Sequence, residues 1–376
     1  MWRLGALGII HCWGLIINRP QPLNTIFNSL LMDVVHFHRR PQPTHFSIEG
    51  YFDRIRGCFC RAQQAGERGE FRDQTIRVCT MPCFSSGIVG RVRNILSAWR
   101  NQGSVNHITG DVQYIALLLK RDCTLLTVLD CQILERLTGW KRAVVKWLWY
   151  TLPSKRVTAI TVISAETKRQ LLSEIRFPAQ KIHVIPVSVS PLFQPAPKHF
   201  NTVCPRILQV GTKANKNVHR LVEALKGLRC HLDIVGPIDE TLQRELQDNA
   251  IQFSGYGRLT DEQIVERYRE ADIISFVSTY EGFGMPIVEA QCVERVCVTS
   301  NCSSMPEVAG DAACLVDPFR VESIREGFLR VIHDEVYRES LIEKGRANRL
   351  RFDEYTLAVQ YAQLYRRLSQ QSGADL

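Results

Sequence analysis

The sequence predicts an α/β protein of two Rossmann-like lobes, each built on a parallel sheet, with a cleft between them. Short apolar runs alternate with amphipathic stretches through nearly the whole chain, and this order is typical of parallel sheets covered by helices. The alternation stops at a Pro-rich segment, PLFQPAPKHFNTVCP (191–205), and then starts again. The length of 376 residues also suits two domains, each with its own core.

Twelve short runs rich in strand-forming residues are expected to build the two sheets. Six precede the Pro-rich segment, at 33–38, 75–80, 104–108, 124–129, 159–163 and 182–185. Six follow it, at 206–210, 231–235, 251–254, 272–277, 295–299 and 313–316. Helical periodicity fills the gaps and is clearest at 218–228, 261–271 and 354–368.

These runs divide the chain into four segments. We expect residues 32–195 to form the first lobe, 196–353 the second, and 354–376 a C-terminal helix that could cross back onto the first lobe. Residues 1–31 are apolar, but they hold His11, lack a small-residue cleavage site and are short for a membrane span. We therefore expect them to be an extension outside the folded core rather than a signal anchor.

Charge is divided unevenly between the two halves of the chain. Residues 1–200 hold 26 basic and 12 acidic side chains, and residues 201–376 hold 21 and 26, so the net charges are +14 and −5. The Arg and Lys residues are scattered rather than clustered, which argues against a nucleic-acid partner. With 45% hydrophobic and 23% charged residues, the composition is that of a globular protein and excludes disordered and fibrous classes.

The thirteen cysteines do not indicate a metal site. None forms a C-x-x-C pair, and structural zinc sites usually need such paired spacing. Most of them lie among Val, Ile and Leu, as expected for small buried residues in a reducing cytosol.

Residues 272–318 carry the most chemical information. This segment reads strand, Gly-containing loop, helix, strand, Gly-rich turn and strand. The loop Glu281-Gly282-Phe283-Gly284-Met285-Pro286 leads into the helix, and Pro286 suits a first helical turn. The glycines let backbone N–H groups approach a ligand closely. A helix start with free N–H groups and no acidic residue in its first turn suits a diphosphate.

Two glutamates bracket this loop at a spacing of eight residues. Glu289 lies on the helix, where its carboxylate can accept hydrogen bonds from the vicinal hydroxyls of a ribose. Glu281 lies in the loop and could reach a sugar hydroxyl on the other side of the phosphates. The alternative is that Glu281 caps the helix and Glu289 is solvated. The two glycines and the proline between them favour the binding interpretation.

The sequence resembles family 4 glycosyltransferases, which are retaining nucleotide-sugar enzymes with the GT-B fold. EGFGMPIVEA (281–290) followed by SSMPEVAGDAACLVDP (303–318) is similar to the donor-binding signature of that family. Similar segments are LQVGTKANKNVHRLVEAL (208–225), VISAETKRQLLSEIRFPAQKIHVIPVSVSPLF (162–193) and HFSIEGYFDRI (45–55). The likeness covers residues 33–368. It implies that the first lobe binds the acceptor and the second the nucleotide sugar.

The resemblance implies a role for each matching residue in the second lobe. Glu289 would bind the donor ribose, and Glu281 the transferred sugar. Lys216 matches the lysine that neutralises the diphosphate. The remaining donor-site candidates are Gly211, Gly282, Phe283, Gly284 and Met285, with Tyr256, Gly257 and Arg258 as candidates for the nucleobase site. Where relatives often have Arg after the strand glycine, this chain has Thr212, and Lys213 is a candidate substitute.

The catalytic positions of the first lobe depart from the family pattern. Relatives commonly have a His-Asp pair at the end of a strand, and here Leu129 takes the place of the His beside Asp130. Leucine can neither donate a hydrogen bond nor transfer a proton. His107, at the end of the preceding strand, is a candidate cleft residue that takes over part of this role. The alternative is that His107 bonds backbone carbonyls and nothing more.

The resemblance implies metal-independent, retaining transfer of a sugar from a nucleotide-diphosphate sugar to a glycan, a lipid-linked or another hydroxyl acceptor. No Asp-x-Asp pair suggests a metal, and no cofactor besides the donor is expected. The alternative is a catalytically weak or inactive nucleotide-sugar-binding protein, indicated by Leu129 and Thr212. A Rossmann dehydrogenase is disfavoured, because no G-x-G-x-x-G follows the first strand of either lobe.

Two segments of the first lobe mix basic and aromatic residues. GIVGRVRNILSAWR (87–100) and KRAVVKWLWYTLPSKR (141–156) suit a peripheral membrane contact. The alternative is two ordinary helices with core-facing aromatic rings and solvated cations. The positive charge of this half points to an anionic acceptor or membrane surface, so we expect a cytoplasmic protein, peripheral at the inner face of the membrane.

Overall fold

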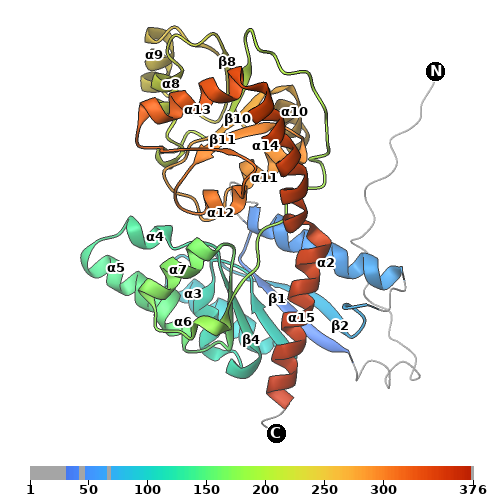
Figure 1. Ribbon diagram of the computed structural model, residues 1–376. Coiled ribbons are helices and arrows are strands. Elements are labelled where there is room, and N and C mark those ends of the chain that lie inside the picture. Colours follow the sequence, from blue (N-terminus) through green and yellow to red (C-terminus); the bar gives the residue numbers. More distant parts are fainter. Residues whose placement is uncertain (1–30, 42–46, 66–68, 374–376) are drawn as a thin grey trace, which may run out of the picture.

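The computed structural model of this chain describes residues 31–41, 47–65 and 69–373. Two α/β lobes lie one above the other, and the last helix runs along the side of the first lobe (Figure 1). The segment expected to be an N-terminal extension falls almost wholly outside the described residues.

The first lobe is built on a six-stranded parallel sheet in the order β2-β1-β3-β4-β5-β6. Its strands are β1 (Met32–His38), β2 (Gln74–Thr80), β3 (Val105–Ile108), β4 (Thr124–Val128), β5 (Ala159–Val162) and β6 (Ile182–Val184). Its helices and helical turns are α2 (Ser47–Gln64), α3 (Ile88–Arg100), η2 (Gln113–Leu118), η3 (Arg121–Cys123), α4 (Gln132–Glu135), α5 (Gly139–Lys146), the π-helix η4 (Trp147–Thr151), α6 (Leu152–Ser154), α7 (Ala165–Glu174) and η5 (Ala179–Lys181). The six strands predicted for this half are confirmed.

The second lobe has a six-stranded parallel sheet in the order β12-β11-β10-β7-β8-β9. Its strands are β7 (Arg206–Val210), β8 (His231–Val235), β9 (Gln252–Tyr256), β10 (Ile273–Phe276), β11 (Val296–Ser300) and β12 (Cys314–Val316). Its helices and turns are η6 (Ala214–Lys216), α8 (Val218–Leu225), α9 (Glu240–Asp248), α10 (Asp261–Glu270), α11 (Met285–Cys292), α12 (Met305–Ala309), α13 (Val321–His333), α14 (Glu335–Asn348) and η7 (Arg349–Phe352). These six predicted strands are confirmed as well.

Central strands of both sheets are covered on both faces. Every residue of β4, β10 and β11 is buried. Since helices bury both faces of a parallel sheet, such strands appear in the sequence as continuous apolar runs rather than as alternating patterns. The short loops that follow these strands gather at one edge of each sheet, and these two edges face each other between the lobes.

The two lobes share part of their hydrophobic core. One cluster of buried side chains runs from the first lobe through the hinge into the second. The Phe193 and Tyr268 rings meet edge to face with centroids 5.2 Å apart, and Phe283 and Phe352 meet in the same way at 5.6 Å. Two further clusters each belong to a single lobe.

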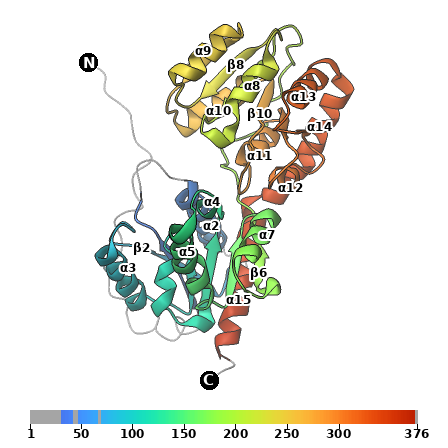
Figure 2. The same ribbon diagram turned by 90° about the vertical axis from the view of Figure 1, so that its left-hand side faces the viewer.

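Helix α15 (Glu354–Gly373) leaves the second lobe and lies along the first (Figures 1 and 2). Gln74 at the start of β2 donates a 2.9 Å hydrogen bond to the Ala362 carbonyl, and Arg366 forms an ion pair with Asp73 at 2.9 Å. The helix therefore completes the first lobe, although it follows the second in the chain. No helix in the described ranges is long and apolar enough to cross a membrane.

Candidate active site

A cavity of about 720 Å³ lies between the two lobes. Its first-lobe wall is formed by residues that follow β1, β3, β4 and β5, and its second-lobe wall by residues that follow β7 and β10. The site candidates that line this cavity are Asp130, Lys216, Glu281, Gly282, Phe283, Gly284 and Met285. The carboxyl edge of parallel sheets is where α/β proteins usually bind ligands, so the cavity is the candidate active site.

Lys216 and Glu281 form the charged pair of this cavity. Lys216 Nζ donates a 2.6 Å hydrogen bond to Glu281 Oε1 and lies 4.7 Å from the centroid of the Phe276 ring. The lysine side chain passes over Gly211, where a Cβ atom would come within 3.2 Å of Lys216 Cε. Gly211 also has a φ of +88°, so two independent constraints favour glycine there.

Asn215 is a further member of this group. Its Nδ2 donates to Glu281 Oε1 at 3.0 Å and to the Tyr280 carbonyl at 3.1 Å. No motif in the sequence marks Asn215, although it stands beside Lys216 in the same short turn. Its amide and the Lys216 ammonium thus donate to the same oxygen of the Glu281 carboxylate.

The loop of residues 281–284 positions the start of helix α11. Gly284 immediately precedes the helix with a φ of +125°, and Pro286 lies in the first turn, as predicted. No side chain caps this helix start and its first turn holds no acidic residue. The backbone N–H groups at the start of α11 can therefore serve an anion in the cavity. The Phe283 side chain, by contrast, is 5% exposed and belongs to the core, so only its backbone is available to a ligand.

Glu289 lies about one turn after the start of α11, where its carboxyl is desolvated by burial. Tyr268 donates a hydrogen bond of 2.5 Å to Glu289 Oε2. Burial raises the pKa of the Glu289 carboxyl to about 7, while the Tyr268 hydrogen bond and the charges of Lys216 and Arg54 oppose this rise. Arg54 comes from α2, so a first-lobe cation acts on a second-lobe carboxylate.

The remaining candidates of the second lobe lie at the ends of strands β7 and β9, on either side of β8 in the sheet. Gly211 N–H donates to the Val235 carbonyl at 2.7 Å, and Gly236 N–H to the Tyr256 carbonyl at 2.8 Å. These bonds set the three strand ends side by side. Gly257 and Arg258, which follow β9, and Lys213, which follows β7, are exposed at this edge.

Two of these side chains are held within the second lobe. Thr212 donates its hydroxyl to the Pro237 carbonyl at 2.7 Å. The Tyr256 hydroxyl donates to Asp233 at 3.3 Å and accepts from Arg267 at 3.2 Å. At both positions, the backbone is better placed than the side chain to meet a ligand.

Asp130 and Leu129 lie on the opposite wall, at the end of β4. Burial raises the pKa of the Asp130 carboxyl above its ordinary value, and the nearby carboxylates of Asp111 and Glu281 act in the same direction. Gly282 approaches this wall closely, since a Cβ atom there would come within 2.9 Å of the Leu129 carbonyl oxygen. Leu129 lines the cavity beside Asp130.

The expectation that His107 lies in the cleft is wrong. Its side chain is completely buried beneath α15. Nδ1 is 2.8 Å from the Tyr365 hydroxyl and Nε2 is 2.7 Å from the Thr127 hydroxyl. The alternative of backbone carbonyl partners is also wrong, because both partners are side-chain hydroxyls. Burial lowers the pKa of His107 well below its usual value, so the ring is neutral and structural.

Arg39 and Asp111 complete the first-lobe wall and form an ion pair at 2.5 Å.

In the part of the chain that the structure describes, no group of three or more His, Cys, Asp or Glu side chains could hold a metal ion.

Comparisons with known proteins agree with this fold. Residues 195–348 match the family described as "Glycosyl transferases group 1". A solved structure of Anabaena Alr3699/HepE in complex with UDP and glucose superposes on 89% of this chain and 99% of its own, with a TM-score of 0.67 and 15% identity. WaaG, a glycosyltransferase involved in lipopolysaccharide biosynthesis, superposes on 89% of this chain and 99% of its own at a TM-score of 0.63 and 14% identity.

The whole chain therefore has the GT-B fold. Its second lobe is similar to the group 1 glycosyltransferase family over residues 195–348.

Curated relatives are similar to this chain over part of their length. O-antigen chain mannosyltransferase B of Escherichia coli is 30% identical over 175 residues, which are 43% of this chain and 45% of that protein. MMP alpha-(1->4)-mannosyltransferase of Mycolicibacterium hassiacum is 27% identical over 248 residues, which are 60% of this chain and 59% of that protein. The chain thus spans about half the length of these relatives.

Proposed function

We propose that this protein is a retaining glycosyltransferase that moves a sugar from a nucleoside-diphosphate sugar to a hydroxyl acceptor, without a divalent metal. The observation that carries the proposal is the Lys216–Glu281 pair, 2.6 Å apart, beside the uncapped start of α11 in the cavity between the lobes. Because the curated relatives include mannosyltransferases, mannose is the first donor sugar to test.

Transfer builds positive charge on the anomeric carbon and negative charge on the leaving diphosphate. Fixed charges and dipoles stabilise such a leaving group best, because they need no reorganisation during the reaction. Lys216 Nζ can pass from Glu281 to a phosphate oxygen, and the N–H groups at the start of α11 can donate hydrogen bonds to a second phosphate oxygen. The Glu281 carboxylate is then available to a hydroxyl of the transferred sugar.

The anomeric configuration is retained if the acceptor attacks the sugar ring on the same face from which the phosphate leaves. The bond between the anomeric carbon and the phosphate oxygen breaks, a bond to the acceptor oxygen forms, and the acceptor proton passes to a phosphate oxygen. This route needs no general base in the position of Leu129. Asp130, whose pKa is raised, lies on the same wall and is placed to bind an acceptor hydroxyl.

A donor screen followed by a transfer assay tests the proposal. Each of a panel of nucleotide sugars, including GDP-mannose and UDP-glucose, is added to the full chain and unfolding is followed by thermal shift. A specific donor at 100 times its Kd should stabilise the fold by about 2.7 kcal/mol. NMR of the product should show the donor's anomeric configuration, and EDTA should leave the rate unchanged. Stabilisation by none of the nucleotide sugars, or an inverted product, would contradict the proposal.

The rival function, a nucleotide-sugar-binding protein with little transfer activity, is indicated by Leu129 and Thr212. The variant Leu129→His distinguishes the two. If the wild-type chain binds a donor without transferring its sugar, and Leu129→His gains hydrolysis or transfer, the rival is correct. If the wild-type chain transfers sugar, Leu129 does not prevent catalysis.

We propose further that an anionic membrane surface is a partner of the first lobe. Large apolar side chains project from α3 and α5, with Ile88 78%, Val89 67% and Trp140 73% exposed. Basic residues accompany them, among them Arg93, Arg100 and Lys141. The Arg91 guanidinium lies 4.7 Å from the centroid of the Trp149 ring in η4, which joins α3 to the segment after α5. Apolar and cationic side chains together are typical of peripheral membrane contacts.

Liposome flotation tests this surface. The wild-type chain should float with vesicles containing anionic lipid at low salt, and the double variant Ile88→Ser/Trp140→Ser should bind them more weakly. Val336→Ser, which removes an equally exposed apolar side chain from α14 in the other lobe, should bind like the wild type. Failure of the wild type to float at low salt would contradict the membrane proposal, and it would not affect the transferase proposal.

A further inference from the structure

The loop of residues 281–284 is tied to both lobes. On its own side, Ser303 donates its hydroxyl to the Glu281 carbonyl at 2.7 Å, and Ser304 donates to the Phe283 carbonyl at 2.5 Å. Ser303 has a φ of +57°, an unfavourable conformation for a residue with a side chain. This turn is therefore strained at Ser303, and its two serine hydroxyls hold the carbonyls of the loop.

The first lobe holds the carbonyl at the centre of the same loop. Ser164 donates its hydroxyl to the Gly282 carbonyl at 2.8 Å, and the Thr167 hydroxyl lies 3.2 Å from the same oxygen. Both of these donors are completely buried. They belong to the start of α7, so the backbone conformation of the loop depends on a helix of the opposite lobe.

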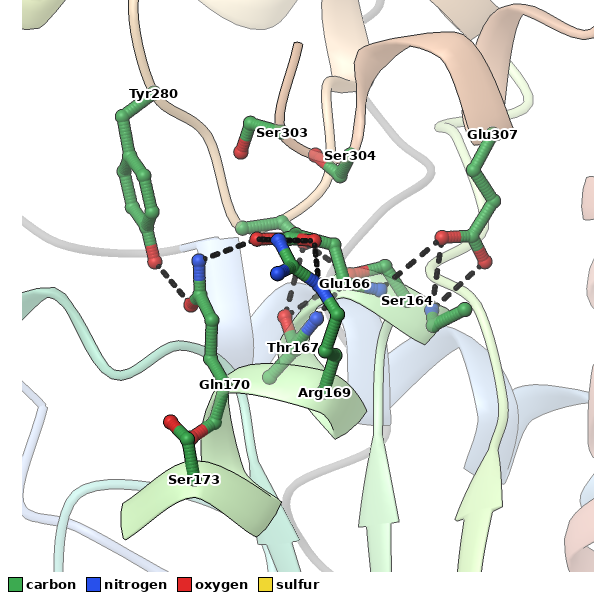
Figure 3. Close-up of polar contacts among 12 residues, drawn as sticks. Ser164, Glu166, Thr167, Arg169, Gln170, Ser173, Tyr280, Ser303, Ser304 and Glu307 are labelled. Carbon is green, nitrogen blue, oxygen red and sulfur yellow. Dashed lines mark hydrogen bonds and ion pairs between the residues drawn. The ribbon is translucent and has the colours of Figure 1, made fainter.

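A second contact joins the lobes, and here a side chain of the second lobe supports a helix of the first lobe (Figure 3). Glu307 of α12 accepts hydrogen bonds from the Ala165 N–H at 2.8 Å and from the Glu166 N–H at 3.4 Å. Ser164 is the N-cap residue of α7, and its hydroxyl oxygen accepts a hydrogen bond only from the third N–H of the helix, that of Thr167, at 3.0 Å. The carboxylate that completes the cap of this first-lobe helix therefore comes from the second lobe.

A third link extends this contact along α7. The Tyr280 hydroxyl donates to Gln170 Oε1 at 2.7 Å, and Gln170 Nε2 donates to Glu166 Oε1 at 2.7 Å. Figure 3 shows Tyr280 and Glu307 reaching α7 from either side of Ser303 and Ser304. Any movement of the lobes apart would break all three links together and leave the loop held by its own lobe alone.

We infer that Ser164, Thr167 and Glu307 are positioning residues that fix the 281–284 loop only when the lobes are closed. This inference rests on the proposed function. Glu281 and the start of α11 flank this loop, so its geometry decides whether they meet the transferred sugar and the leaving phosphate together. Binding of a nucleoside diphosphate to the second lobe does not need these interlobe contacts, whereas sugar transfer needs them.

Two variants remove the contacts without disturbing the groups that face the cavity. Glu307→Ala removes the carboxylate cap, and Thr167→Val removes one hydroxyl donor while keeping the shape of the side chain. The matched control is Asp334→Ala. It removes a carboxylate that caps α14 through the Tyr337 N–H at 2.9 Å, wholly within the second lobe.

We expect both variants to lower kcat roughly 10- to 100-fold, the size of effect that follows from small misplacement of reacting groups. The Kd of the nucleoside diphosphate, UDP or GDP, should stay within about twofold of the wild-type value, since positioning and not affinity is lost. Small-angle X-ray scattering should show a larger radius of gyration for Glu307→Ala than for the wild type. Asp334→Ala should change neither kcat nor the radius.

Unchanged kcat and radius in Glu307→Ala would overturn the inference, and so would an equal loss in Asp334→Ala. A loss of nucleotide affinity as large as the loss of kcat would also overturn it. If the wild-type chain transfers no sugar at all, the proposed function fails. The scattering comparison then still decides whether Glu307 holds the lobes together.

Discussion

Lys216 Nζ lies 2.6 Å from Glu281 Oε1, although the two residues follow different strands of the second sheet. The lysine ends a short turn after β7 and the glutamate follows β10, and the two strands are neighbours in the sheet. Adjacent parallel strands bring their carboxyl ends together, so residues 65 positions apart in the chain form one charged pair.

Loss of either member of this pair should abolish most of the transfer activity. We expect Lys216→Ala and Glu281→Ala each to lower kcat by about 10²–10³, the usual effect of removing one preorganised electrostatic group. Steady-state transfer assays give the rate, and circular dichroism checks the fold. Lys226→Ala, which removes an exposed lysine just after α8, is the control. Near-normal turnover by either test variant would contradict the site.

The raised pKa of Glu289 should make the stability of the protein pH-dependent near neutrality. Its carboxyl has a pKa of about 7 in the folded chain against an ordinary value of 4.5. The folded state therefore holds this proton more tightly than the unfolded state. The resulting stabilisation is fully present below about pH 4.5 and is lost as the pH rises through 7.

The variant Glu289→Gln isolates this effect. Between pH 5 and 7 the wild-type free energy of unfolding should fall relative to that of Glu289→Gln, by at most about 1.4 kcal/mol per pH unit for one proton. Urea unfolding at several pH values gives the two curves. Parallel curves over this range would show that Glu289 ionises alike in the folded and unfolded states.

The fold was largely predictable because its signals are local. A buried strand such as Ile273–Phe276 appears as a short apolar run, and the break at 191–205 separates two complete series of strand-forming runs. The 281–286 loop was equally clear, since glycine, proline and the bracketing glutamates all belong to one segment. Local chemistry and strand order thus give the second-lobe wall of the cavity.

The first-lobe wall was less predictable because its contacts are distant in sequence. His107 was expected in the cleft because it stands near the end of a strand, but Tyr365, which lies 258 positions away, covers it with α15. Similarly, Glu307 caps a helix that begins 142 positions earlier. No periodicity or motif encodes which helix covers a strand face or which lobe supplies a cap.

The closeness of Gly282 to the first lobe should make this position intolerant of a side chain. Its added Cβ would lie 2.9 Å from the Leu129 carbonyl oxygen and 3.1 Å from Asp130 Cβ, so the lobes would have to separate by a few tenths of an ångström. We expect Gly282→Ala to lower kcat by about 10-fold or more, because such shifts misalign reacting groups. Gly69→Ala, where nothing lies within 4 Å of the new Cβ, is the matched control. Equal rates in the two variants would argue against a close interlobe approach during catalysis.

The buried hydroxyl of Tyr365 should contribute to the attachment of α15. It lies 2.9 Å from His36 Nε2 and 2.8 Å from His107 Nδ1, and all three side chains are completely buried. Removing the hydroxyl leaves two buried imidazole nitrogens without this partner, which costs about 1–3 kcal/mol. We therefore expect Tyr365→Phe to lower the free energy of unfolding by that amount.

Urea denaturation of the full chain measures this loss. Tyr355→Phe, a change on the same helix at a side chain that is 47% exposed, should leave stability within about 0.5 kcal/mol of the wild-type value.

The structural role of His107 gives a parallel expectation, since His107→Gln should lower the free energy of unfolding while the pH dependence of kcat is retained. A changed pH profile with unchanged stability would instead place His107 in the reaction.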